Sequence, residues 1–221
     1  MLTGAGAVYI VNAPMAATSQ PLIFRRLGSV DYLHAEHAMK QFTQKRTMEV
    51  MDEVWLLEHD PIYTTGVREA AEPKRDAASI PIIKTNRGGE MTYHGPGQLV
   101  AYFLLNIRKR RLGPRSLVNQ LEELIIDFLG SYEVIAKRRQ GAPGVYVGGK
   151  KIASLGLHTT ATYCYHGISI NVKMDLRPFE HIEVCGIPNL EMTQLSSLVN
   201  GITIEDALNR LEKCIRKRFS E

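Results

Sequence analysis

The residues best suited to chemistry lie in one glycine-rich segment, Arg87 to Gln98, which reads RGGEMTYHGPGQ. Its four glycines leave much of the backbone without side chains, permit positive φ angles and let a ligand approach the amide groups closely. Arg87 can hold an anion, and Thr92 and His94 supply polar atoms for hydrogen bonds. This interleaving of polar residues with glycines predicts a ligand-binding loop rather than an ordinary hairpin loop.

The three cysteines differ in their sequence surroundings. Cys164 lies in an apolar strand-like segment and Cys214 on the apolar side of a predicted helix, so both are expected to be small core residues. Cys185 is followed by Gly186 and Pro188, which indicate a bend with a free neighbouring amide. This spacing alone fits a nucleophilic thiol and an inert thiol equally well. The odd number and wide spacing of the cysteines argue against a disulfide framework and favour a reducing compartment.

A metal site is not expected. The pairs Cys164/His166 and His181/Cys185 lack the regular spacing of a structural zinc site, and the sequence contains no HExxH motif.

The elements that must position these residues begin with a strand-like segment, 21–27. A helix follows, with Ser29 as its N-cap and an apolar face formed by Val30, Leu33, Ala38 and Phe42. Strands are then predicted over 54–59, 81–86 and 99–107. A second amphipathic helix has an apolar face of Leu117, Leu121, Leu124, Ile125 and Phe128.

The remaining third of the chain is rich in strand-like segments and closes with a helix. Residues 133–139, 145–147, 150–157 and 164–172 favour strands, with a Gly148-Gly149 turn between two of them. The last helix begins near Thr203 and is expected to bury Ile204, Leu208, Leu211 and Ile215. Strands with three interspersed helices predict an α/β or α+β single domain, over 21–221, with a mixed central sheet.

Charge and hydropathy narrow the function classes. The formal net charge is +4, too small for a nucleic-acid-binding signature, and no apolar run is long enough to span a bilayer. Two basic clusters, 108–111 and 137–139, are either solvated faces or docking sites for an acidic protein. Residues 1–20 contain no Lys, Arg, Asp or Glu, unlike a signal or transit peptide. We expect them to form a flexible extension of a cytoplasmic protein.

Three blocks of the chain resemble the lipoyl(octanoyl) transferase family. They are the Arg87–Gln98 loop, the segment GAPGVYVGGKKIASLGL and the segment YHGISINVKMDLRPFEHIEVCGIPNLEMTQL. The resemblance runs in order from about residue 21 to the C-terminus, although Val184 stands where family members often have proline. It implies a fold similar to the catalytic domains of biotin and lipoate protein ligases.

The resemblance also implies site residues. Cys185 is the implied nucleophile and Lys151 its partner lysine, while strand alternation turns Lys150 to the opposite face. The implied substrate-binding residues are Arg87, Gly88, Gly89, Glu90, Met91, Thr92, Tyr93, His94, Ser154, Leu155, Gly156, Gly167, Ile168 and Ser169.

The implied reaction transfers octanoyl from octanoyl-acyl carrier protein to a lysine of a lipoyl domain. Acceptors would be the lipoyl domains of 2-oxoacid dehydrogenase complexes and the glycine cleavage H protein. The acyl group arrives as a thioester, so no cofactor is expected; neither nucleic acid nor membrane is an expected partner. An ATP-dependent lipoate- or biotin-type ligase and a non-catalytic module that binds an acylated carrier remain alternatives.

Overall fold

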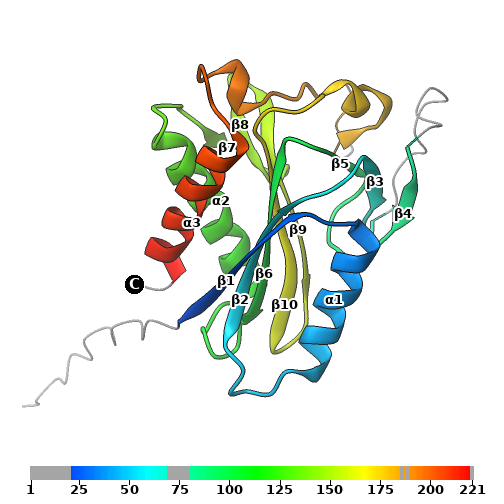
Figure 1. Cartoon of the computed structure of the whole chain (residues 1–221), viewed down its shortest axis with the longest axis vertical. Helices are drawn as coiled ribbons and strands as arrows, with labels where there is room; N and C mark the ends of the chain where they lie inside the picture. The colour runs from blue at the N-terminus through cyan, green and yellow to red at the C-terminus, as the bar shows by residue number, and fades with distance from the viewer. Residues whose placement is uncertain (1–20, 69–79, 185–186, 188–189, 220–221) are drawn as a thin grey trace, which may run out of the picture.

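The computed structural model describes residues 21–68, 80–184, 187 and 190–219. These residues form two sheets, three α-helices and short 3-10 turns (Figure 1). Residues 1–20, and with them the predicted extension, lie outside the described part of the chain.

The larger sheet has seven strands in the order β1-β2-β6-β10-β9-β8-β7. Their bounds are β1 Leu22–Ser29, β2 Asp52–Glu58, β6 Gln98–Asn106, β10 Tyr163–Asn171, β9 Lys150–Thr159, β8 Val145–Val147 and β7 Lys137–Arg138. β1 and β2 are parallel and every other neighbouring pair is antiparallel. The sheet is therefore mixed, and the predicted α/β single domain with a mixed central sheet is confirmed.

A smaller sheet carries the second half of the site. It has the order β4-β3-β5, with β3 at Ile62–Thr65, β4 at Ile82–Lys84 and β5 at Thr92–His94. The sequence analysis missed β3 and placed Thr92 to His94 in a loop. Strands of three or four residues show too little alternation to be recognised, because their stability comes from pairing with distant segments.

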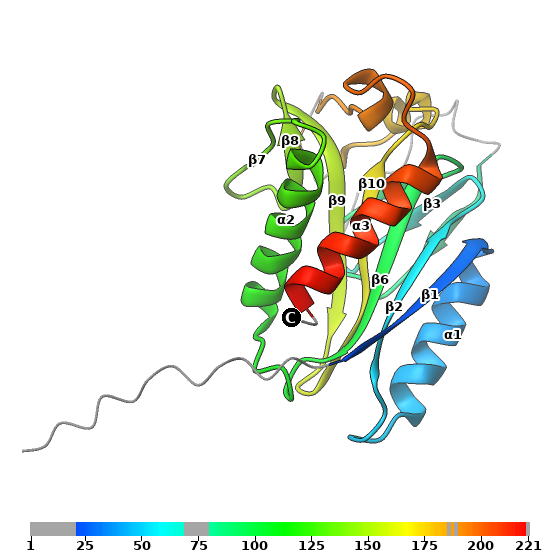
Figure 2. The same cartoon turned by 60° about the vertical axis from the view of Figure 1, so that its left-hand side comes forward.

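The helices lie on both faces of the large sheet (Figure 2). Helices α2 (Pro114–Gly130) and α3 (Ile204–Phe219) cover one face, and α1 (Tyr32–Lys45) covers the other. β6 is buried along its whole length because it is covered on both sides. Phe103 and Leu105 pack toward α2 and α3, whereas Val100, Tyr102 and Leu104 pack on the α1 side.

Three local predictions need correction. Asp31, not Ser29, caps α1, because its carboxylate accepts the amide of His34 at 2.9 Å. The predicted residues Val30, Ala38 and Phe42 do pack, partly buried, against the core on this side. The fully buried residues of α1 are nevertheless Tyr32, Ala35 and Met39, and the predicted Leu33 is exposed. Of the strand predicted over 133–139, only Lys137–Arg138 pairs as β7. The predicted face of α3 does pack on the core: Leu211 and Ile215 are buried, and Ile204 and Leu208 are partly buried against it. Ala207 and Phe219 are buried as well.

Within the described residues, no helix has the length and hydropathy needed to cross a membrane.

Candidate active site

The glycine-rich loop owes its shape to Arg87. The guanidinium donates from Nε to Thr64 Oγ1 at 3.1 Å and from Nη2 to the carbonyl oxygens of Thr64 at 2.6 Å and Glu90 at 2.7 Å. It also donates to the carbonyl of Gly88 at 3.1 Å. The Gly88 amide in turn donates to the Leu157 carbonyl of β9 at 2.8 Å. Arg87 therefore ties the loop to the small sheet, and Gly88 ties it to the large one.

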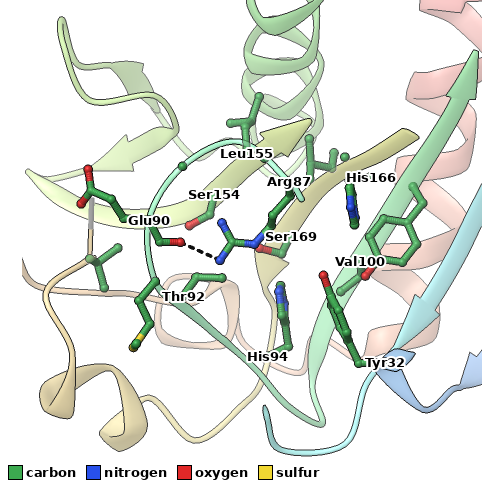
Figure 3. Close-up of a pocket in the computed structure, with 17 residues that line it drawn as sticks. Tyr32, Arg87, Glu90, Thr92, His94, Val100, Ser154, Leu155, His166 and Ser169 are labelled. Carbon is green, nitrogen blue, oxygen red and sulfur yellow. Dashed lines mark hydrogen bonds between the residues drawn. The ribbon is translucent and has the colours of Figure 1, made fainter. Parts of the chain in front are cut away.

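A pocket lies between this loop and the large sheet, and it unites most of the predicted substrate-binding residues (Figure 3). The predicted residues that line it are Arg87, Gly89, Glu90, Met91, Thr92, His94, Ser154, Leu155, Gly156, Gly167, Ile168 and Ser169. Three blocks that are far apart in the sequence therefore meet at one cavity. The sheet register explains this, because Ser154 and Ser169 are paired, as are Leu155 and Ile168, and Gly156 and Gly167.

Two of the predicted substrate-binding residues do not line the pocket. Gly88 makes the backbone contact with β9 described above. Tyr93 points to the other side of β5, where its ring packs against Tyr63 and Phe179. Alternation along β5 turns Thr92 and His94 to the pocket and Tyr93 away from it.

Five residues that line the pocket were not predicted as site residues from the sequence: Tyr32, Val100, Tyr102, His166 and Val184. Tyr32 was missed because the predicted apolar face of α1 included the exposed Leu33 and omitted the buried Tyr32. Val100 and Tyr102 lie in an unbroken apolar run, which hides the alternation between the two faces of a doubly covered strand.

His166 reaches the pocket through an unusual backbone conformation. Its neighbour Tyr165 already faces the α1 side of β10, so regular alternation would turn His166 to the other side. His166 instead has φ of 61°, and its ring contacts both Tyr102 and Tyr165. Positive φ is costly for a non-glycine residue and tends to occur at functional sites. Nothing in the local sequence signals this conformation.

Hydrogen bonds fix the histidine rings of this region. His94 donates from Nδ1 to Gln98 Oε1 at 2.7 Å, and His166 donates from Nε2 to Asn86 Oδ1 at 3.0 Å. Behind them, His59 donates from Nδ1 to the Val30 carbonyl at 2.6 Å and accepts the Tyr102 hydroxyl at 2.7 Å. Thr92 Oγ1 and His166 Nδ1 are buried with no hydrogen-bond partner among the described residues.

Burial keeps the histidine and tyrosine side chains of the pocket neutral. Desolvation is the main cause that lowers the pKa of His94 and of His166 to about 3, and the charge of Arg87 adds to both shifts. Burial also raises the pKa of Tyr32 to about 12 and that of Tyr102 well above its usual value. These imidazoles and phenols are therefore uncharged at neutral pH.

Lys151 is completely buried near the start of β9. Its ammonium group donates to the Pro143 carbonyl at 2.9 Å and lies 5.7 Å from the ring centre of Tyr146. The adjoining Gly144 amide donates to Glu122 Oε1 at 3.0 Å, which anchors this turn to α2. Lys150, by contrast, is half-exposed and pairs with Glu191 at 2.5 Å. The two lysines thus point to different sides, as strand alternation predicts.

A β-bulge places Lys151 on the face that carries the pocket. Val145 pairs with Ala153 and Tyr146 with Lys151, so Ile152 is an extra residue in β9. Ile152 and Ala153 both pack into the core on the α2 side. Alternation restarts at the bulge, so Lys151 lies on the same face of β9 as Ser154.

The described residues on either side of Cys185 lie at the pocket and at Lys151. Cys185 itself lies outside the described residues, but the preceding Val184 lines the pocket. Farther along, Lys151 donates its amide to the Glu191 carbonyl at 2.8 Å and accepts the Thr193 amide at 2.9 Å.

The other two cysteines fit the predicted core roles. Cys164 is fully buried, and its burial raises the pKa of the thiol to about 12. Cys214 is half-buried against the core, and burial raises its pKa as well. Neither thiol lines the pocket.

Metal ligands are not gathered at one place in the described part of the chain, where no group of three or more His, Cys, Asp or Glu residues is suitably arranged.

Comparison with known proteins relates this chain to acyl transfer. The family model "Lipoyl protein ligase A/B catalytic domain" matches residues 31–216. Curated octanoyltransferases from Vibrio atlanticus (strain LGP32) and Azoarcus sp. (strain BH72) are 47% and 46% identical to the chain. The first match covers 86% of this chain and 87% of the relative, and the second covers 95% and 93%.

Solved structures share the fold at much lower identity. A lipoate-protein ligase A bound with ATP has a TM-score of 0.72 and 14% identity, covering 90% of this chain and 85% of the other. Biotin protein ligase from Aquifex aeolicus has a TM-score of 0.55 and 13% identity, covering 90% and 69%. The chain thus belongs to the lipoyl protein ligase A/B catalytic-domain family and, within it, to the octanoyltransferases, which are acyltransferases.

Proposed function

We propose that this chain transfers octanoyl from octanoyl-acyl carrier protein to the lysine of a lipoyl domain through a thioester on Cys185. The acceptors would be lipoyl domains of 2-oxoacid dehydrogenase complexes and the glycine cleavage H protein, and the reaction would take place in the cytoplasm. The observation that carries the proposal is the position of the pocket, which unites the predicted substrate-binding residues and is lined by Val184, the residue before Cys185.

The reaction has two balanced steps. The Cys185 thiolate attacks the donor thioester carbonyl, a tetrahedral oxyanion forms, and the carrier thiol leaves after taking up a proton. The unprotonated amine of the acceptor lysine then attacks the new thioester, forms an amide, loses a proton and releases the Cys185 thiol. The energy of the donor thioester is sufficient, so ATP is not needed.

Lys151 is the residue we assign to assist Cys185. A lysine ammonium stabilises a neighbouring thiolate, and a neutral amine can accept a proton. The burial of Lys151, its fixed bond to the Pro143 carbonyl and its backbone pairing with Glu191 and Thr193 support this role. Thr92, with a buried hydroxyl in the pocket lining, is available to donate to a substrate oxygen.

An ATP-dependent ligase is the second candidate, because the solved relatives with the same fold include a lipoate-protein ligase bound with ATP. The two candidates differ in the donor that they require. In the test, the chain is incubated with a lipoyl domain in two separate reactions. One contains octanoyl-carrier protein alone, and the other contains octanoate with ATP and Mg²⁺. We expect octanoylation only from the carrier thioester. Octanoylation only from octanoate and ATP would assign the ligase activity instead.

A further inference from the structure

Four aromatic side chains at one end of the pocket stand out from the rest of its lining. Tyr32 from α1, His94 from β5, Tyr102 from β6 and His166 from β10 together form what we call the end wall. Each is at most 6% exposed. Figure 3 shows Tyr32, His94 and His166 on one side of the pocket and Glu90 on the opposite side.

The strand register shows which end of the pocket this is. On β9, Lys151 comes first, Ser154 follows, and Leu157, the partner of His166, lies farther still. On β6, Val100 pairs with Ser169 and Tyr102 pairs with Gly167, which gives the same order. Tyr102 and His166 therefore lie at the end of the pocket most distant from Lys151 along the sheet. Tyr32 reaches the same end from α1, because its ring and the Tyr102 hydroxyl both contact His59, whereas His94 approaches from the small sheet, where it bonds Gln98.

The end wall is rigid. The rings of Tyr32 and His94 stack at 5.8 Å with an angle of 20° between them, and Tyr102 meets His166 edge-on at 5.9 Å. His59 lies behind the end wall and is fully buried. It contacts two members of the wall, the Tyr102 hydroxyl and the Tyr32 ring at 5.0 Å, and it is held in place by its bond to the Val30 carbonyl. Extending the pocket would require these fixed rings to move.

The distance along the sheet from Ser154 to the end wall matches the length of a medium acyl chain. Three strand residues separate Ser154 from Leu157, and three residues span about 10 Å along a strand. An extended chain of eight carbons measures roughly 9 Å, because each bond of about 1.5 Å advances it by slightly less than its length. A chain whose carbonyl lies beyond Ser154 toward Lys151 would reach the end wall with its last carbons.

We propose that the end wall is the stop that sets the maximum acyl length, and that the Tyr32 ring is its limiting member. This inference rests on the proposed function, because it assumes that the pocket holds the acyl chain. Tyr32 is the best residue to test because it comes from α1 rather than from the sheet. Its ring can be removed without placing a substitution in a central strand.

The experiment compares wild type with Tyr32→Ala. Thermal unfolding is followed with fatty acids of 6, 8, 10, 12 and 14 carbons, and transfer is measured with the matching carrier thioesters. We expect the stabilisation of wild type to peak at eight carbons and that of Tyr32→Ala to peak at ten or twelve. The ratio of kcat/KM for decanoyl to that for octanoyl should rise about tenfold, the factor expected from burying two more methylenes.

Tyr132→Ala is the matched control, because it removes a ring of the same size that packs on Phe128, on the opposite face of the sheet. It should lower the melting temperature without moving the chain-length profile. Tyr32→Leu, which keeps an apolar side chain on α1, takes the place of Tyr32→Ala if the latter does not fold.

The outcomes separate the inference from the function on which it rests. Two results would contradict the proposal that the end wall limits acyl length. One is the same dependence of thermal stabilisation on fatty-acid length in wild type and in folded Tyr32→Ala or Tyr32→Leu. The other is a wild-type stabilisation that shows no maximum with chain length. Failure of wild type to transfer any acyl group would overturn the proposed function, while the binding profile would still decide whether Tyr32 limits chain length.

Discussion

Lys150 and Lys151 are adjacent in the sequence but differ in environment. Lys151 is buried and bonded to the Pro143 carbonyl, whereas Lys150 is half-exposed in an ion pair with Glu191. Charge interactions are stronger in a desolvated site than in water. Lys151 is therefore the lysine that we expect to affect the Cys185 thiol.

Removal of Lys151 should make Cys185 harder to ionise. We predict that Lys151→Ala raises the apparent pKa of Cys185 and slows acylation by ~10²-fold or more, the usual scale for a positioned acid–base group. Lys150→Ala is the matched control and should change neither. The measurement is alkylation of Cys185 by iodoacetamide across pH, with peptide mass to separate it from Cys164 and Cys214. An equal shift in both variants, or a shift in Lys150→Ala alone, would contradict the assignment.

The buried histidines make stability depend on pH. Burial lowers the pKa of His94 and His166 to about 3, whereas an unfolded histidine titrates near 6.5. The folded state therefore binds fewer protons than the unfolded state between these values. The stability contributed by the neutral rings is complete above pH 6.5 and is lost as pH falls toward 3, with a slope of up to about 1.4 kcal/mol per pH unit for each ring.

We predict that His166→Gln is less stable than wild type at pH 7.5 but loses less stability between pH 6.5 and 4.5. Urea unfolding at a series of pH values measures both quantities. The control is His34→Gln, at an exposed position of α1. Its free energy of unfolding should depend on pH with the same slope as that of wild type. If the slope of His166→Gln equalled that of wild type, His166 would not be neutral and buried in the folded protein.

At the scale of elements, the turn before β8 and the bulge in β9 position Lys151. Gly144 has φ of 136°, and a Cβ atom there would lie 2.6 Å from Lys151 Cε and 2.7 Å from the Ala153 carbonyl oxygen. No side chain fits such a space without displacing the lysine. The absence of a side chain at Gly144 is therefore a requirement for the observed place of Lys151.

Gly144→Ala should reduce transfer at least tenfold by moving Lys151, a size typical of misplaced catalytic groups. Gly201→Ala is the control, because Gly201 also has positive φ, 72°, but a Cβ atom there would meet nothing within 4 Å. Both variants pay a backbone cost, so both should melt earlier than wild type. Equal losses of activity would show that backbone strain, not contact with Lys151, is responsible.

Elements with long periodic patterns were predictable from sequence, and those that depend on distant pairing were not. The apolar stripe of α2, from Leu117 to Phe128, is buried as predicted. The face of α1 was predicted only in part: Val30, Ala38 and Phe42 pack against the core, but the buried Tyr32 was omitted because it can be read as a surface aromatic. β3 and β5 are too short to show alternation. The glycine-rich loop was predicted as a binding loop from its own glycines and polar residues, and the segments 154–156 and 167–169 were predicted from the family resemblance; all three contribute to the pocket lining. The bulge at Ile152 and the positive φ of His166 have no local signal.

At the scale of the whole molecule, the structure separates the two basic clusters. Residues 108–111 follow β6 at the end of the sheet where Asn106 pairs with Tyr163, far from Lys151. Within that cluster, Arg110 is buried against Asp52 and the Phe219 carbonyl. The other cluster, 137–139, lines a surface groove together with Tyr146 and the Gly148-Gly149 turn. Arg139 also lines an adjoining groove with Lys150, Ile187 and Glu191, next to the segment of Cys185.

An acidic acyl carrier should therefore dock at residues 137–139. We predict that Lys137→Glu and Arg139→Glu raise the KM for octanoyl-carrier protein about tenfold at low salt, and that the penalty shrinks as ionic strength rises. Lys109→Glu, at the other end of the sheet, should leave KM unchanged. A rise in KM for the lipoyl domain instead of the carrier would assign this groove to the acceptor, and equal effects of Lys109→Glu would exclude a local docking site.

Cys185 is the residue that we propose carries the octanoyl group between donor and acceptor. Intact mass is measured after a short incubation with octanoyl-carrier protein, without ATP and without acceptor, and peptide mass then locates the adduct. The account predicts one octanoyl group on Cys185 of wild type, removed on addition of a lipoyl domain, and none on Cys185→Ser, because a serine hydroxyl is far less ionised than a thiol. Transfer at a normal rate by Cys185→Ser, or an adduct on Cys164 or Cys214 that passes to the acceptor, would contradict it.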